Sequence, residues 1–103
     1  MKLNIGERIT LLNILPEKGN FETMDTVDKL RAVLVLGEEE VKKYNFKQTE
    51  ERAKWDISGN ERVKIEISPI GVAFLINALR DADRSDNLTI ERYHILKRFN
   101  EED

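Results

Sequence analysis

Residues 52–67, RAKWDISGNERVKIEI, are the stretch in which the spacing of apolar residues changes from a helical period to a period of two. Apolar residues alternate with charged ones on both sides of the polar stretch 58–61: Ala53, Trp55, Ile57, Val63, Ile65 and Ile67. This alternation is typical of strands with one buried face. The sequence therefore predicts an antiparallel β-hairpin formed by residues 53–57 and 63–67.

The apolar faces of these two strands define a register for the predicted hairpin. Residues directly opposite each other in an antiparallel pair share a face, so Trp55 is expected opposite Ile65, in the core rather than at an interface. The same register sets opposite charges across from each other on the solvent face: Asp56 with Lys64, and Lys54 with Glu66. Two independent patterns thus favour the same pairing.

Helical periodicity predicts three helices before this hairpin, over residues 3–15, 24–36 and 38–44. Asn4 is expected to cap the first helix, with Glu7 completing a capping box. Thr23 or Asp25 is expected to cap the second helix. Gly37 follows that helix, at the position where a left-handed terminating residue is favoured.

Two more helices are predicted after the hairpin. Ser68 is expected to cap the first, with Pro69 at its first position, and Thr89 is expected to cap the second. The acidic residues 101–103 are expected to form a frayed end. The chain is therefore predicted to be a single α+β domain over residues 1–103, with three N-terminal helices, a β-hairpin and two C-terminal helices in a degenerate winged-helix-like order.

The composition excludes several classes of protein. The 103 residues include no cysteine, which excludes disulfides, zinc–thiolate sites, iron–sulfur clusters and cysteine nucleophiles. Hydrophobic residues make up 40% of the chain and the net charge is only −3, which argues against intrinsic disorder. The longest apolar run, residues 33–36, is far too short to span a membrane. We therefore expect a soluble, cytoplasmic protein that makes no membrane contact.

Charge decides how a winged-helix-like order is interpreted. Binding to DNA depends on neutralising phosphates with lysine and arginine. Acidic and basic residues number 8 and 7 in residues 1–45, 5 and 5 in residues 46–67, and 7 and 5 in residues 68–103. The third predicted helix begins with three glutamates, at positions 38–40. Nucleic-acid binding is therefore disfavoured, and a scaffold that contacts proteins fits these charges better.

One segment has the spacing of a calcium-binding loop. Oxygen-bearing residues occupy the first, third, fifth, seventh and ninth ligand positions: Asp81, Asp83, Ser85, Asn87 and Thr89. However, Asp86 stands where glycine makes the sharp turn, and Arg92 stands where a bidentate glutamate belongs. We expect residues 81–91 to contain a polar loop between helices, and the sequence leaves open whether this loop binds a cation.

Residues with catalytic chemistry are few. His94 is the only histidine, and its neighbours at helical spacing form no recognisable triad. The five glycines are scattered, so no glycine-rich loop is available to bind phosphates. We therefore expect no enzymatic activity, no catalytic residues, no cofactor and no metal site.

The solvent face of the predicted hairpin is the expected surface for a partner, together with the region around one aromatic residue. The candidate residues of this surface are Arg52, Lys54, Arg62, Lys64 and Phe46. The oligomeric state stays open, and the apolar content of the last two helices would allow a dimer.

Residues 5–12 and 15–19, IGERITLL and LPEKG, resemble the N-terminal helix and turn of a group of small uncharacterised proteins encoded by bacteriophages and prophages. Trp55-Asp56 and residues 65–79 resemble the middle of these proteins, and residues 87–99 are similar to their ends. The resemblance implies a phage or mobile-element origin and carries no catalytic residues. The resulting hypothesis is a non-enzymatic protein that binds another protein, either to modulate a host factor or to serve as an assembly accessory. The alternative is a winged-helix-like, nucleic-acid-binding transcriptional regulator.

Overall fold

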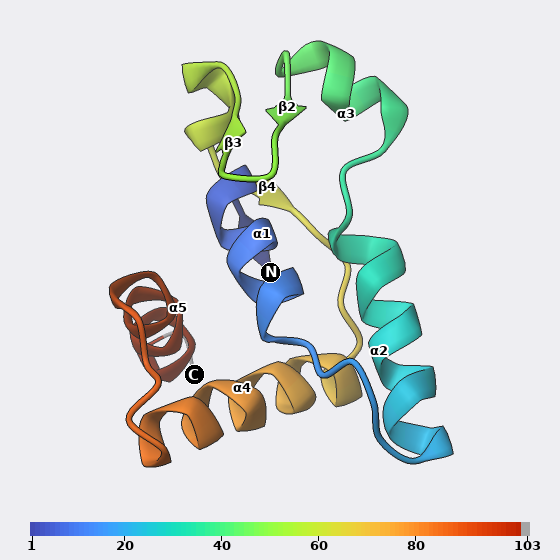
Figure 1. Cartoon of the computed structure of the whole chain (residues 1–103), viewed down its shortest axis with the longest axis vertical. Helices are drawn as coiled ribbons and strands as arrows, with labels where there is room; N and C mark the ends of the chain where they lie inside the picture. The colour runs from blue at the N-terminus through green and yellow to red at the C-terminus, as the bar shows by residue number, and fades with distance from the viewer. Residues whose placement is uncertain (102–103) are drawn as a thin grey trace.

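A computed structural model describes residues 1–101 and has the α+β class that the sequence predicts (Figure 1). The helices are α1 (Ile5–Ile14), α2 (Phe21–Leu34), α3 (Glu38–Lys43), the 3-10 helix η1 (Ile57–Asn60), α4 (Pro69–Arg84) and α5 (Ile90–Glu101). The strands are β1 (Lys2–Leu3), β2 (Lys47–Gln48), β3 (Ala53–Lys54) and β4 (Val63–Lys64). They form two small antiparallel sheets, in which β1 pairs with β4 and β2 pairs with β3.

The hydrophobic core lies around α1, which contacts α2, α4, α5 and η1. Figure 1 shows α1 in the middle of the molecule, with α2 and α5 on opposite sides and α4 crossing beneath. The largest fully buried side chains are all leucines: Leu3, Leu11, Leu34, Leu75 and Leu79. Full burial of one such side chain stabilises a fold by about 1.5–3 kcal/mol, so these residues hold β1, α1, α2 and α4 together.

The capping box predicted for α1 is confirmed. The Asn4 side chain accepts a hydrogen bond from the Glu7 N–H (2.8 Å), and the Glu7 carboxylate accepts one from the Asn4 N–H (3.0 Å). The cap predicted for α2 is wrong, because Asn20 caps this helix by accepting a hydrogen bond from the Thr23 N–H (2.8 Å). As a result α2 begins three residues earlier than expected, at Phe21.

The prediction that Gly37 terminates α2 in a left-handed conformation is wrong. Its φ is −74°, and it is the N-cap residue of α3. Helix α2 ends earlier, at Leu34, and Val35 is its C-cap residue. The carbonyl groups of Leu34 and Val35 accept hydrogen bonds from Arg8 on α1 (2.9 and 2.8 Å). These bonds satisfy two of the carbonyls at the end of α2 that have no partner within the helix.

The predicted hairpin of residues 53–57 with 63–67 is wrong. Strand β3 pairs with β2, whereas β4 pairs with β1, and the residues between β3 and β4 form η1. Alternation of apolar residues identifies which side chains share a face, but it does not identify the partner strand. Each half of the predicted hairpin therefore pairs with another segment of the chain.

The expected pairing of Trp55 with Ile65 does not form. The Trp55 indole N–H donates to the Asn60 side chain (2.9 Å), and the Ile65 N–H donates to the Met1 carbonyl (2.7 Å). Gly59 allows η1 to lie directly against α1 and the Trp55 ring. A Cβ atom on Gly59 would lie 2.5 Å from Ile5 Cδ1 and 2.7 Å from Trp55 Cδ1, so this close approach to α1 requires glycine.

The predicted ion pairs across that hairpin are wrong for the same reason. No ion pair in residues 1–101 joins Asp56 to Lys64 or Lys54 to Glu66. Instead, Lys64 Nζ lies 3.3 Å from Glu66 Oε1, on the same segment of the chain.

The predicted starts of both C-terminal helices are confirmed. The Ser68 hydroxyl accepts a hydrogen bond from the Gly71 N–H (3.1 Å), with Pro69 at the first helical position. The Thr89 hydroxyl accepts one from the Arg92 N–H at the start of α5 (3.2 Å). The predicted frayed end falls mainly on residues 102 and 103, which lie outside the described residues.

The two sides of the segment after β4 give a test of this fold. Ile65 is half-buried and packs against the core, whereas the Lys64 side chain is exposed. Ile65→Asp should lower the free energy of unfolding by at least about 2 kcal/mol, because it places an unpaired carboxylate against apolar side chains. Lys64→Asp should change it by no more than about 0.5 kcal/mol. Urea denaturation followed by circular dichroism measures both, and equal midpoints would contradict this assignment of faces.

Candidate interaction surface

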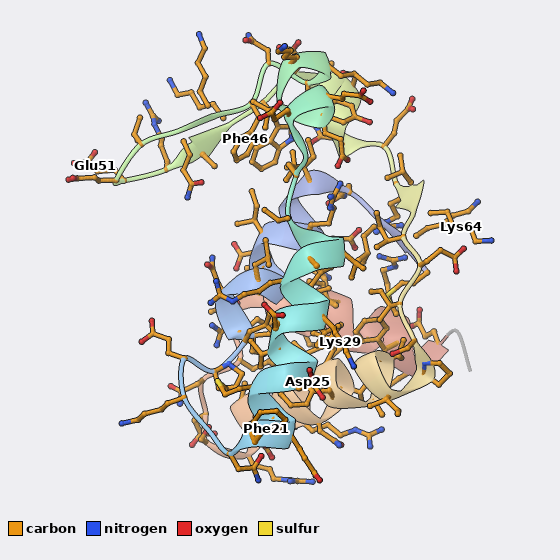
Figure 2. All side chains as sticks on the ribbon, turned by 90° about the vertical axis from the view of Figure 1, so that its right-hand side faces the viewer. Phe21, Asp25, Lys29, Phe46, Glu51 and Lys64 are labelled. Atoms are coloured by element: carbon orange, nitrogen blue, oxygen red, sulfur yellow. The ribbon has the colours of Figure 1, made fainter. Side chains whose placement is uncertain are left out.

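Strands β2 and β3 form a hairpin that projects from the body of the molecule, here called the hairpin arm (residues 47–54). Lys47 lies opposite Lys54 and Gln48 lies opposite Ala53. The turn is closed by the Thr49 N–H, which donates to the Arg52 carbonyl (2.8 Å), and by the Arg52 N–H, which donates to the Thr49 hydroxyl (3.3 Å). Figure 2 shows Glu51 at the tip of the arm, far from the core.

One face of the hairpin arm is cationic. Lys47 shares a face with Lys54, which lies opposite it. Because side chains alternate between the two faces of a strand, Arg52, two residues before Lys54, lies on the same face. These three residues, the cationic face, line one open hollow of about 610 Å³ together with Thr49, Glu50 and Glu51. None of the ion pairs in residues 1–101 involves Lys47, Arg52 or Lys54.

The direct pairing of Lys47 with Lys54 is unfavourable within the chain. Like charges directly opposite each other in an antiparallel pair destabilise it. An anionic group from another molecule, placed between the two ammonium groups, would remove this repulsion. The arrangement is therefore suited to binding an anionic surface.

The other face of the arm anchors it to the body. Phe46 and Trp55 continue the register of the hairpin, and their rings stack with centroids 6.3 Å apart. The Trp55 ring also packs near Gly6 at the start of α1, where a Cβ atom would lie 3.6 Å from Trp55 Cζ2. At the base, the Asp56 N–H donates to the carbonyl of the buried Tyr44 (2.8 Å). The arm thus extends into solvent, while the contacts at its base attach it to the body of the molecule.

Helix α3 carries the arm and is itself fixed by a buried arginine. Arg8, with 2% of its surface exposed, binds both carboxylate oxygens of Glu40 (2.5 and 3.1 Å). Its guanidinium hydrogen bonds hold the pKa of the Glu40 carboxyl below its ordinary value, although burial acts in the opposite sense. The Glu40 carboxylate also accepts from the Gly37 N–H (3.2 Å), which completes the start of α3.

The structure brings together only part of the predicted surface. Arg52 and Lys54 lie on the cationic face of the arm, and Phe46 lies half-buried at its base. Lys64 belongs to β4 in the other sheet, and Figure 2 places it on the opposite side of the molecule from the arm. Arg62 makes an ion pair with Glu7 on α1 (3.1 Å). The structure therefore does not bring these five residues together, because β3 and β4 belong to different sheets.

Arg62 has a structural environment centred on Glu7. The Glu7 carboxylate accepts hydrogen bonds from Arg62 and, at short distance, from Arg98 on α5. Burial raises the pKa of the Glu7 carboxyl, but the hydrogen bonds from the Asn4 N–H, Arg62 and Arg98 outweigh it and leave this pKa below its ordinary value. The carboxylate thus joins the segment before β4 to α1 and α5.

Lys47 is the residue of the cationic face that the predicted partner surface does not include. The sequence pattern predicts no strand at residues 47–48, because a two-residue strand is too short to show alternation. The available signal was the pair of apolar residues Phe46 and Trp55, whose side chains flank a polar stretch of hairpin length.

The calcium-like segment forms the end of α4 and the loop that follows it. Asp81 and Asp83 lie within α4, and Asp81 makes an ion pair with Arg84 (3.0 Å). Asp86 has a φ of 59°, and the Asn87 N–H donates to the Ala82 carbonyl (2.8 Å), which is a helix-terminating geometry. Among residues 1–101, no group of three or more histidine, aspartate or glutamate side chains is arranged to hold a metal ion.

His94 lies exposed on α5, with its ring centroid 5.3 Å from that of Tyr93. A hollow of about 200 Å³ beside it is also lined by Glu7, Thr10 and Glu91. Because the Glu7 carboxylate is already bound by two arginines, it is not placed to act as a base toward this hollow.

No helix in residues 1–101 has the length and apolar character needed to cross a bilayer.

The Arg8–Glu40 pair gives a pH-dependent prediction. Because the folded-state pKa of Glu40 is below its ordinary value of 4.5, its ionised form stabilises the fold above that pH, and this stabilisation is lost as the pH falls through the folded pKa. Glu40→Gln should lower the free energy of unfolding at neutral pH by about 1–3 kcal/mol, since it weakens charge-assisted bonds to a buried guanidinium. The variant should also lose less stability than the wild type between about pH 5 and about pH 3.

Urea denaturation at a series of pH values tests this expectation. Glu39→Gln, at the exposed neighbouring position on α3, is the matched control and should leave the profile unchanged. Identical acid dependence in the wild type and Glu40→Gln would show that this carboxylate does not support the fold.

Known proteins provide no template for this surface. Comparison of the chain with protein-family models, with curated proteins and with solved structures found no match.

Proposed function

We propose that this chain is a non-enzymatic protein that acts by binding another protein, and that the hairpin arm contacts an acidic patch on that partner. The observation that carries the proposal is the cationic face, on which Lys47, Arg52 and Lys54 lie together without a carboxylate partner in the described part of the chain. Charge complementarity of this kind speeds association and favours the correct partner.

The position of the arm supports a role in binding. Every residue from 47 to 52 is exposed, so the arm contributes little to the core. A two-stranded hairpin is marginally stable by itself in water, and here the Phe46–Trp55 stack compensates by anchoring its base. Because the anchoring face and the cationic face are opposite, a partner can bind the arm without disturbing its attachment.

The charges around the cationic face favour a protein over a nucleic acid as the partner. Residues 38–54, which include α3 and the arm, contain five basic and five acidic residues. Glu50 and Glu51 lie at the tip of the arm, where they would meet a phosphate backbone unfavourably. A protein surface can present carboxylates to the three cations and other groups to the tip.

The second candidate function is winged-helix-like nucleic-acid binding. The specific observation in its favour is the order of three helices followed by a hairpin with a cationic face, which is the place of the wing in winged-helix proteins. In this alternative, Lys47, Arg52 and Lys54 contact phosphates, and the protein regulates transcription. The two candidates use the same residues and differ in the anion that these residues recognise.

The resemblance to small phage and prophage proteins suggests the biological setting of the proposal. We place the protein in the cytoplasm of a bacterial host, where its partner is a host protein whose activity it modulates. Bacterial lysate is therefore the source in which a partner is expected.

Reversing the charges of the cationic face tests the proposed function. Wild-type protein and the triple variant Lys47→Glu, Arg52→Glu, Lys54→Glu are immobilised and exposed to bacterial lysate, and retained proteins are identified by mass spectrometry. The matched control reverses three exposed cations elsewhere: Lys18, Arg80 and Lys97. A partner should be retained by the wild type and the control, and its purified form should bind the arm variant roughly tenfold or more weakly.

Labelled duplex DNA distinguishes the second candidate. If the arm contacts phosphates, the slope of log affinity against log salt should become about 3 units shallower in the arm variant, because three phosphate contacts are lost. DNA binding with this dependence would replace the proposed function by the second candidate. Equal retention of every bound protein by the wild type, the arm variant and the control would rule out the arm as the binding surface.

A further inference from the structure

The outer face of α2 carries a stripe of four exposed residues spaced four apart: Phe21, Asp25, Lys29 and Val33. Residues at this spacing lie above one another on a helix surface. The stripe has apolar residues at its ends and a charge pair in its middle, where Lys29 Nζ lies 3.0 Å from Asp25 Oδ2. Figure 2 views the molecule onto this face and shows Phe21, Asp25 and Lys29 facing outward along α2.

This outer stripe is complementary to itself. A two-fold axis passing between Asp25 and Lys29 brings a second α2 antiparallel to the first. Each Asp25 then lies opposite Lys29 of the second copy, and each Phe21 lies opposite Val33 of the second copy. The ends of the stripe are about 18 Å apart along the helix, and the two-fold axis lies midway between them.

A groove runs beside the stripe from Asp25 to Val33, between α2 and the start of α4. It has a volume of about 380 Å³. Its apolar part is lined by Leu30, Val33, Ile67, Ile70 and Gly71, and its polar part by Asp25, Thr26, Lys29, Glu66 and Ser68. Ile70 is 74% exposed and Val33 is 38% exposed, so the groove is open to solvent. A Cβ atom on Gly71 would come within 3.0 Å of Leu30 Cδ2, which shows how closely the walls approach each other at its base.

The chain itself supplies a side chain for this groove. Phe21 is 88% exposed, which makes it the most exposed large hydrophobic residue among residues 1–101. In the antiparallel arrangement, the ring of Phe21 from one copy meets Val33 of the other at the rim of the groove. Burying an aromatic ring in an apolar groove of the partner is typical of the residues that contribute most to binding energy.

We propose that two copies of this chain form a two-fold symmetric dimer through α2, in which Phe21 of each copy enters the groove of the other and Asp25 pairs with Lys29 across the interface. The occupant is a second copy rather than another protein, because the stripe (apolar, acidic, basic, apolar) is complementary to the same stripe in the reverse direction. Each acidic residue then lies opposite a basic one, and each apolar residue lies opposite an apolar one. A contact of this kind is isologous, so it closes at two subunits.

The dimer does not depend on the proposed function of the hairpin arm. The arm and the outer stripe lie at different ends of the molecule, and Figure 2 shows Glu51 far from Phe21. Dimerisation through α2 therefore leaves both cationic faces accessible, and a partner with two acidic patches would meet two arms at once.

Charge swaps at the centre of the stripe test the dimer. Sedimentation velocity and light scattering on the full chain should show a dimer in the wild type. Lys29→Asp places two aspartates opposite each other, Asp25→Lys places two lysines opposite each other, and each should raise the dissociation constant roughly tenfold or more. An equimolar mixture of the two variants should associate again, because both contacts across the interface then join a lysine to an aspartate.

Substitution of the aromatic residue gives an independent test. Phe21→Ser should weaken the dimer, whereas Ile90→Ser, at another exposed apolar residue on α5, is the matched control and should not. Because the side chains of Asp25 and Lys29 are exposed, all variants should fold, and circular dichroism and melting temperature verify this. A monomeric wild-type chain, a dimer unaffected by these changes, or a mixture that does not associate would overturn the proposal.

Discussion

The buried guanidinium of Arg8 is the interaction on which the arrangement of the N-terminal half depends. It donates to the last carbonyls of α2 and to both oxygens of Glu40, so one side chain of α1 fixes the end of one helix and the start of the next. A buried charge is costly unless it is paired and hydrogen-bonded, and these bonds offset that cost. The path from α2 to α3 is therefore tightly constrained.

This constraint reaches the proposed binding surface through α3. Because Glu40 is held by Arg8, α3 presents Tyr44 to the core, and the Tyr44 carbonyl receives the Asp56 N–H at the base of the hairpin arm. The Phe46–Trp55 stack then sets the direction of the arm. The arm thus lies outside the core but is positioned by it. Its three cationic residues form none of the ion pairs within residues 1–101.

Local patterns predicted local structure well. The Asn4–Glu7 capping box and the Ser68 cap with Pro69 depend on residues at most three positions apart, so their sequence spacing contains the full interaction. Strand pairing does not have this property. The alternation in residues 53–57 and 63–67 indicated a shared apolar face, but the partners of these strands, β2 and β1, are themselves only two residues long and give no periodic signal. The predicted partner surface was based on this hairpin, and it therefore grouped Arg62 and Lys64 with the residues of the arm.

The charge pair at the centre of the outer stripe illustrates why a contact within one chain and a contact between chains can support each other. Alone, the exposed Asp25–Lys29 pair contributes little to stability, since both groups are well hydrated. In the antiparallel arrangement, four charges of alternating sign lie around the two-fold axis, and each has an oppositely charged neighbour in its own chain and another in the second copy. Desolvating a charge is less costly when it gains a second counter-charge, so the pair favours the copy that presents the same sequence in reverse.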